Sequence, residues 1–168
     1  IGMDADEENV LRARENLAPF RGRVRFFHAN FADADEVLRQ AEIDRVDVLL
    51  ATRNSARFLD PMLDSLAAQD HRDFHLIIGD DASSDDTLAR VERKREGFAN
   101  PVEVIARTEP SGSARANFSD LIERSRGDYV FLADHDDIWL SHKISTALSA
   151  LSEAERALGA DTPILFHT

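Results

Sequence analysis

The chain has 168 residues, 43% of them hydrophobic, and its 32 acidic side chains exceed its 20 basic ones, for a net charge of −12. This length fits one globular domain, or one complete unit with part of another. The negative field repels phosphate backbones and no basic patch offsets it, so we expect no nucleic-acid partner. The absence of cysteine excludes a disulfide framework, a thiolate zinc site and a cysteine nucleophile. No apolar run approaches the roughly 20 residues that span a bilayer.

Short apolar runs alternate with stretches of helical periodicity along the whole chain. This pattern is typical of βαβ units and predicts an α/β fold, a three-layer Rossmann-like sandwich with a mostly parallel sheet. The pair Asp60-Pro61 predicts one helix start, the segment 84–86 predicts a second, and Ser141 is the expected cap of a long last helix. About seven strands are predicted, at 1–3, 24–28, 46–51, 75–79, 102–106, 129–133 and 163–166.

The predicted strand 129–133 runs directly into Asp134-His135-Asp136. Residues two apart in an extended chain point to the same side, so Asp134 and Asp136 can converge on one ligand. Magnesium and manganese accept oxygen ligands, and magnesium is usually held by one or two carboxylates together with substrate phosphates. The pattern therefore favours a metal-bound diphosphate, although an Asp-x-Asp by itself also arises by chance in so acidic a chain.

A second acidic pair, Asp80 and Asp81, follows the predicted strand 75–79. In open α/β sheets, ligands bind in the crevice beyond the carboxyl ends of the strands, where a carboxylate can accept hydrogen bonds from a base or a ribose. The alternative is a turn that caps the next helix. Because three strands end in polar groups, the third at Thr52-Arg53-Asn54, the interpretation as a shared ligand site is favoured.

Taken in order, these motifs resemble the nucleotide-sugar-binding half of the family-2 glycosyltransferases with the GT-A fold, particularly the bacterial rhamnosyltransferase-like members. The resemblance covers residues 46–168. It is carried by VDVLLATRN at 46–54, FL at 58–59 through LAAQ at 66–69, IIGDDASSDDT at 77–87, NF at 117–118, and GDYVFLADHDDIW at 127–139, followed by Lys143.

The resemblance implies a metal-dependent, inverting transfer of a sugar from a UDP- or dTDP-sugar to an acceptor hydroxyl, with Mg²⁺ or Mn²⁺ as cofactor. It assigns Thr52 to the border of the nucleobase, and Asp81, together with Asp80, to the base or ribose. It makes Asp136 the direct metal ligand and places Asp134 nearer the ribose, close to the metal. It further implies a cytoplasmic enzyme, which could act at the inner face of the membrane.

Three departures from the family pattern matter for this site. Arg53 stands where an aromatic residue commonly stacks near the base, and its guanidinium could stack or pair with phosphate. Ala82 replaces a frequent glycine, which matters where the backbone needs a positive φ. In family members the catalytic base follows the point at which this chain ends, Thr168. We therefore leave the catalytic residues unassigned and expect donor binding without turnover.

Residues 1–50 resemble a different family, the ribosomal RNA cytosine-N4 methyltransferases that use S-adenosylmethionine. The residues that carry this are IGMDAD at 1–6, ARENLAPF at 13–20, VRFFHANFAD at 24–33 and IDRVDVLL at 43–50. The resemblance assigns Asp4 to the cofactor ribose and Asn30 to the region of the adenine, although a surface turn is the simpler interpretation of both. The glycine-rich loop that should precede Ile1 is absent, which argues against methyl transfer.

Because the strand 46–50 satisfies both patterns, we predict a chimera of a methyltransferase-like segment, 1–45, and a glycosyltransferase segment, 46–168. The first residues lack an initiator methionine, so we expect the chain to begin inside a larger ancestor. Two alternatives stay open beside the glycosyltransferase hypothesis. One is a stable α/β scaffold without catalytic activity, and the other is a remnant of the methyltransferase.

Overall fold

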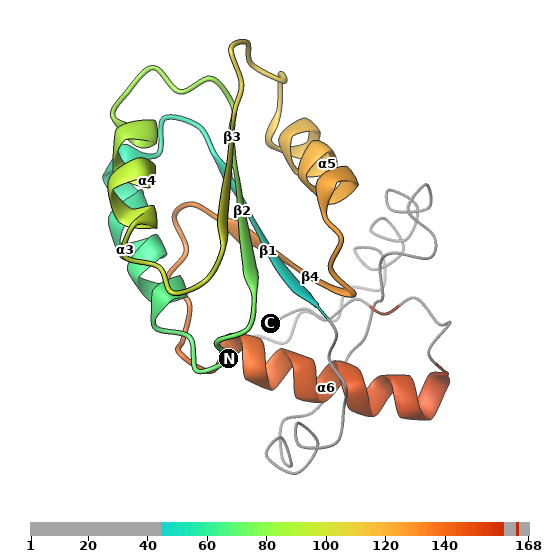
Figure 1. Cartoon of the computed structure of the whole chain (residues 1–168). Coiled ribbons are helices and arrows are strands. Elements are labelled where there is room, and N and C mark those ends of the chain that lie inside the picture. Colours follow the sequence, from blue (N-terminus) through green and yellow to red (C-terminus); the bar gives the residue numbers. More distant parts are fainter. Residues whose placement is uncertain (1–44, 160–163, 165–168) are drawn as a thin grey trace.

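The computed structural model describes residues 45–159 and Ile164, which form an α/β fold in which strands and helices alternate. The sheet has four parallel strands in the order β3-β2-β1-β4 (Figure 1). The strands are β1 (Val46–Thr52), β2 (His75–Asp80), β3 (Val102–Ala106) and β4 (Tyr129–Asp134). The helices are α3 (Ala56–Ala67), α4 (Thr87–Arg95), α5 (Ala114–Arg124) and α6 (Lys143–Leu158).

The predicted α/β class and the parallel sheet are confirmed, whereas a sheet of seven strands is not. Four of the predicted strands agree with β1 to β4 to within one residue at each end. The predicted strands 1–3 and 24–28 lie outside the described residues, as does 163–166 except for Ile164, which belongs to no strand. The described sheet therefore holds four strands.

Helices cover both faces of the sheet, because the apolar residues of the central strand alternate between two cores. Val48 and Leu50 point into the larger core, which they share with buried residues of α3, α4 and α6. Leu49 and Ala51 point to the other face, where α5 packs. Figure 1 shows α3 and α4 on one side of the strands and α5 on the opposite side. None of the helices in the described part of the chain combines the length and apolar character of a membrane span.

Two of the three predicted helix starts are wrong. Helix α3 begins at Ala56, one turn before Asp60-Pro61, because Ser55 serves as its N-cap and the added turn buries Leu59. Pro61 therefore lies inside the helix and, having no N–H, cannot donate to the carbonyl of the exposed Arg57 one turn earlier. The start predicted at 84–86 is confirmed, with Asp86 as the N-cap of α4.

The cap of α6 is His142, one residue after the predicted Ser141. The backbone carbonyl of His142 accepts the N–H of Thr146 at 3.0 Å, which is the first bond of the helix. The carbonyl of Ser141 instead accepts the N–H of Asp70 at 2.7 Å, beyond the end of α3. Because its carbonyl is bound to the segment that follows α3, Ser141 lies outside α6.

A buried carboxylate, Asp47, organises the amino end of the sheet. Its side chain is fully buried and accepts the Ser125 hydroxyl at 2.7 Å and the backbone N–H groups of Arg126 and Gly127, both at 2.8 Å. Arg45 donates to the other oxygen at 3.0 Å. Burial by itself raises the pKa of Asp47, but these four hydrogen bonds together lower it below 3.8. Asp47 therefore fixes the connection from α5 to β4.

We expect Asp47→Asn to lower the free energy of unfolding at pH 7 by about 2 kcal/mol, because an amide nitrogen cannot accept the bonds that a carboxylate oxygen accepts. The folded pKa is lowered, so the stabilisation by Asp47 is present above the unfolded pKa of 3.8 and is lost as the pH falls through the folded pKa. Urea unfolding at pH 7 and below pH 3.8 should show the difference between wild type and variant shrinking. The exposed Asp128→Asn is the matched control, and a pH-independent difference for Asp47→Asn would contradict the prediction.

Candidate functional site

The strand order places a topological switch point between β1 and β4. From β1 the chain proceeds to β2 and β3 on one side and then returns to β4 on the other side. In open α/β sheets the ligand crevice lies at such a point, beyond the carboxyl ends of the strands. The register pairs Thr52 with Asp80 and Ala51 with Asp134, so the predicted polar ends of β1, β2 and β4 lie at one edge of the sheet.

Asp80 is fully buried at this edge and its hydrogen bonds are made within the chain. Its Oδ1 accepts the hydroxyl of Thr52 at 2.9 Å and that of Ser83 at 2.6 Å. Its Oδ2 accepts the backbone N–H of Ser83 at 2.9 Å. Thr52 is itself only 2% exposed, with its hydroxyl directed to Asp80. Asp80 therefore joins the ends of β1 and β2, and the Thr52 hydroxyl is part of that junction.

Asp81 lies beside its neighbour but contacts different elements. Its backbone N–H donates to the carbonyl of Thr52 at 2.9 Å, and its Oδ1 accepts the N–H of Ser111, in the loop before α5, at 2.6 Å. Arg53 lies 3.5 Å from Oδ2, and Arg107, just after β3, lies 3.8 Å from Oδ1. The Asp81 side chain is 4% exposed, whereas that of Arg53 is 48% exposed. Arg53 is thus the solvent-facing group above this carboxylate.

The loops after β1 and β2 are joined by reciprocal hydrogen bonds. The backbone N–H of Asn54 donates to the Ser83 hydroxyl at 2.8 Å, and the side-chain Oδ1 of Asn54 accepts the backbone N–H of Ser84 at 2.9 Å. Asn54 and Ala82 both have positive φ, 49° and 58°. Position 82 thus has a left-handed backbone, which glycine adopts without cost and Ala82 adopts under strain. Loops that are strained and joined by hydrogen bonds at a strand end are typical of a ligand-binding edge.

The acidic turn after β4 differs from the extended geometry that the sequence suggested. The strand ends at Asp134, and the backbone then turns, with the N–H of Asp137 donating to the Asp134 carbonyl at 3.3 Å. The alternation argument for Asp134 and Asp136 is therefore wrong, since Asp136 lies in the turn. Burial raises the pKa of Asp134, and the charges of Asp137 and Asp136 raise it further. A cation would relieve this repulsion.

The donor set of this turn fits a hard divalent cation that shares its coordination with a ligand. Asp134 and Asp136 are both accessible to solvent, although the surrounding protein partly desolvates the Asp134 carboxylate. Oxygen is the donor that Mg²⁺ and Mn²⁺ accept. Across residues 45–159 and Ile164, no three His, Asp or Glu side chains are grouped so as to hold a metal. Two carboxylates complemented by phosphate oxygens match the usual binding of Mg²⁺.

The acidic turn is fixed to helix α3 at both of its ends. The ring of His135 lies 6.3 Å from that of Phe58, between centroids, in the first turn of α3. After the turn, Trp139 is 5% exposed and its backbone N–H donates to the Ser65 hydroxyl at 3.1 Å. The buried amide of Gln69 then donates to the carbonyl of Leu140 at 2.8 Å. The turn thus has a defined position against the end of β1.

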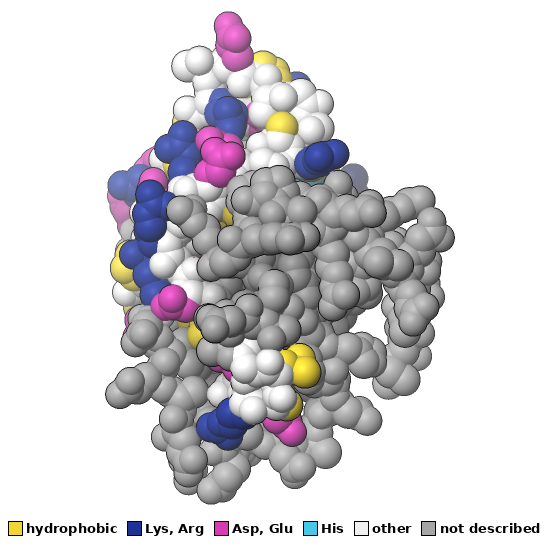
Figure 2. Space-filling model, turned by 90° about the vertical axis from the view of Figure 1, so that its right-hand side faces the viewer, with side chains coloured by type: hydrophobic (Ala, Val, Ile, Leu, Met, Phe, Trp, Pro, Cys, Tyr) yellow, Lys and Arg dark blue, Asp and Glu magenta, His cyan; other side chains and the backbone are white. Residues whose placement is uncertain are grey.

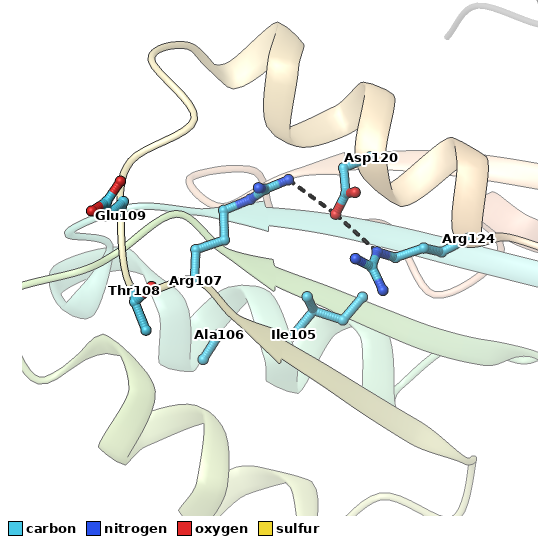
Figure 3. Close-up of a pocket in the computed structure, with 7 residues that line it drawn as sticks. All are labelled: Ile105, Ala106, Arg107, Thr108, Glu109, Asp120 and Arg124. Carbon is cyan, nitrogen blue, oxygen red and sulfur yellow. Dashed lines mark hydrogen bonds and ion pairs between the residues drawn. The ribbon is translucent and has the colours of Figure 1, made fainter.

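A shallow depression of about 370 Å³ lies beside this edge, between the end of β3 and helix α5. Its charged lining residues are Arg107, Glu109, Asp120 and Arg124, and both arginines bind the carboxylate of Asp120 (Figure 3). In the described part of the face drawn in Figure 2, Lys and Arg side chains lie among Asp and Glu side chains. That part of the surface therefore forms no continuous basic patch.

Comparison with known proteins identifies the family. Residues 47–162 match the model of Glycosyl transferase family 2, which is more than half of the chain. The chain belongs to this family. It is 30% identical to a dTDP-rhamnosyl transferase of Shigella flexneri over 105 residues, which are 61% of this chain and 36% of that protein. It is 26% identical over 113 residues to an uncharacterized glycosyltransferase of a Nostoc species, 66% of this chain and 34% of that protein.

Two solved structures share the fold. The crystal structure of S. aureus TarS in complex with UDP is 28% identical, with a TM-score of 0.56, and the match covers 62% of this chain and 31% of that one. A mannosyltransferase from Pyrobaculum calidifontis, solved with GDP-Man and Mn²⁺, is 23% identical with a TM-score of 0.58, covering 84% of this chain and 42% of that one. The chain thus spans about a third of the length of the first curated relatives, which corresponds to part of a glycosyltransferase.

A short stretch is similar to another family. The chain is 47% identical over 47 residues to ribosomal RNA small subunit methyltransferase H of Citrifermentans bemidjiense, which is 28% of this chain and 15% of that protein. Asp4 and Asn30, the residues predicted from this resemblance, lie outside the described residues. The chimera and the boundary at residue 45 stay predictions.

Several residues of this edge were not singled out by the sequence. Ser83, Ser111 and Arg107 contact the acidic pair from the loops after β2 and β3. The rule that ligands bind beyond strand ends could have indicated Arg107, which directly follows the predicted strand 102–106. Nothing in the local sequence indicates that Ser111, thirty residues away, donates to Asp81.

We expect Asp80→Asn to lower the free energy of unfolding by about 1 to 3 kcal/mol, because two hydroxyls and an N–H all donate to this buried carboxylate and one amide cannot accept them all. Asp86→Asn is the matched control, since Asp86 lies on the same loop and makes no side-chain cap bond. Chemical denaturation of both variants measures the difference. Equal stability of the two variants would show that Asp80 does not hold the junction of β1 and β2.

Proposed function

We propose that residues 46–168 form the nucleotide-diphospho-sugar-binding half of a metal-dependent, inverting glycosyltransferase that uses a UDP- or dTDP-sugar and an acceptor hydroxyl. The observation that carries the proposal is the gathering of Asp80, Asp81 and Asp134 at the switch-point edge of a parallel sheet in a family-2 chain. The UDP complex of TarS and the dTDP-rhamnosyl transferase name of a relative support the donor class.

The nucleoside is bound at the ends of β1 and β2 in this proposal. Asp81 accepts hydrogen bonds from the base or ribose, since among the described residues only Ser111 and Arg53 lie within hydrogen-bond distance of its two oxygens. Arg53 covers Asp81 from solvent and either stacks on the base or pairs with phosphate. Asp80 and Thr52 are buried and do not contact the nucleoside directly; the hydrogen bond between them defines the shape of the edge that the nucleoside contacts.

The diphosphate is bound at the acidic turn after β4. Asp136, with Asp134 nearer the ribose, would hold Mg²⁺ or Mn²⁺ there. A bound metal ion supplies Lewis-acid stabilisation of the departing nucleoside diphosphate. The contacts of His135 with Phe58 and of Trp139 with Ser65 orient the turn, so that its carboxylates lie at a fixed position relative to the nucleoside. This preorganisation lowers the cost of binding the charged donor.

Isothermal titration calorimetry of the chain with UDP in the presence of MnCl₂ tests the proposal. We expect binding that a chelator removes and that Asp136→Ala weakens by about tenfold or more, a free-energy difference of about 1.4 kcal/mol or more, because removal of a direct ligand costs metal affinity. The control is Asp128→Ala, an exposed aspartate at the opposite end of β4. Absence of binding at millimolar UDP, or equal binding by the Asp136 variant, would refute the proposal.

Thermal unfolding separates this proposal from the two alternatives. A ligand that prefers the folded state raises the melting temperature. UDP with Mn²⁺ should raise it, whereas a scaffold without ligands would respond to neither. A methyltransferase remnant would instead be stabilised by S-adenosylhomocysteine, and Asp4→Ala would abolish that effect.

A further inference from the structure

Arg107 lies between two carboxylates that compete for its guanidinium. Its Nη2 binds Oδ2 of Asp120, on α5, at 2.9 Å, while its Nε lies 3.8 Å from Oδ1 of Asp81. The first distance is that of a charge-assisted hydrogen bond and the second is not. The guanidinium is therefore held by Asp120 and only faces Asp81 across a gap.

The backbone around Arg107 makes this competition direct. The Arg107 N–H donates to the carbonyl of Asp80 at 2.9 Å, so the residue is attached to the end of β2 next to Asp81. Its side chain is 28% exposed and that of Asp120 is 26% exposed, whereas that of Asp81 is 4% exposed. If Asp120 lost its charge, Asp81 would be the remaining carboxylate within 4 Å of this guanidinium among the described residues.

We propose that Asp120 is a positioning residue of the nucleotide site: by holding the Arg107 guanidinium, it keeps that cation from pairing closely with Asp81 and leaves the Asp81 carboxylate available to the nucleoside. This inference rests on the proposed function, in which Asp81 accepts hydrogen bonds from the base or ribose. It assigns a role to a residue on the outer helix that does not itself touch the nucleotide.

A matched control exists on the same helix. Arg124 binds the same Oδ2 of Asp120 at 2.9 Å, one turn away, but makes no ion pair with Asp81. The hydrogen bond and the charge of Asp120 raise the pKa of Arg124. The guanidiniums of Arg107 and Arg124 share the Asp120 carboxylate. Removal of Arg124 leaves the Asp120–Arg107 pair in place, and removal of Asp120 releases Arg107.

The first test is UDP binding, measured by calorimetry with MnCl₂. We expect Asp120→Asn to weaken UDP binding by about fivefold and Arg124→Gln to leave it unchanged. In the Arg107→Gln background, Asp120→Asn should have no further effect, because no guanidinium remains to be released. Pyrophosphate with Mn²⁺, which engages only the metal and phosphate positions, should bind the wild type and Asp120→Asn equally.

Three results would overturn the inference. They are an unchanged UDP affinity in Asp120→Asn, an equal loss when Arg107 is already absent, and a parallel loss of pyrophosphate affinity that indicates general disruption of the fold. A second test needs no ligand: the coupling free energy between Arg107→Gln and Asp81→Asn, measured by urea unfolding, should increase when Asp120 is replaced by Asn. Failure of the wild type to bind UDP would refute the proposed function, and the unfolding cycle would still decide whether Asp120 holds Arg107.

Discussion

The central position of β1, hydrogen-bonded in parallel to β2 on one side and to β4 on the other, is the constraint on which the rest of this structure depends. Parallel pairing brings all carboxyl ends to one edge. At β1 the strand order changes side, with β2 and β3 on one side and β4 on the other, and such a switch point leaves a crevice beyond that edge. The polar ends of three strands are then neighbours even though Thr52 and Asp134 are more than eighty positions apart in the sequence.

The two acidic residues at the end of β2 have different roles at this edge. Asp80 accepts hydrogen bonds from Thr52 and Ser83, and these bonds join the first two loops and maintain the left-handed backbone at Ala82. Asp81 is oriented by Ser111 and faces two arginines without closing fully onto either. The oxygens of Asp81 can therefore accept a further hydrogen bond, which is the property a nucleoside site needs.

The amino end of the same sheet shows the contrasting use of a buried carboxylate. Asp47 accepts four hydrogen bonds, so its charge is balanced entirely from within the chain and its pKa is lowered. At the carboxyl end, Asp134 has a raised pKa because burial and two neighbouring aspartates oppose its charge. The charge of Asp47 at the amino end is therefore balanced by the protein itself, whereas a cation bound with a ligand would stabilise the charge of Asp134 at the carboxyl end.

The sequence by itself determined the α/β class, the positions of β1 to β4 and the presence of acidic pairs after β2 and β4, because apolar periodicity and turn residues are local signals. Tertiary structure decided the rest. Helix α3 begins at Ala56, after the N-cap Ser55, because Leu59 must be buried against the sheet, and β4 stops at Asp134 because the following turn contacts α3 through Trp139. Only the packing of α5 on β1 and β2 brings Asp120 to Arg107, since contacts between residues distant in sequence carry no local signature.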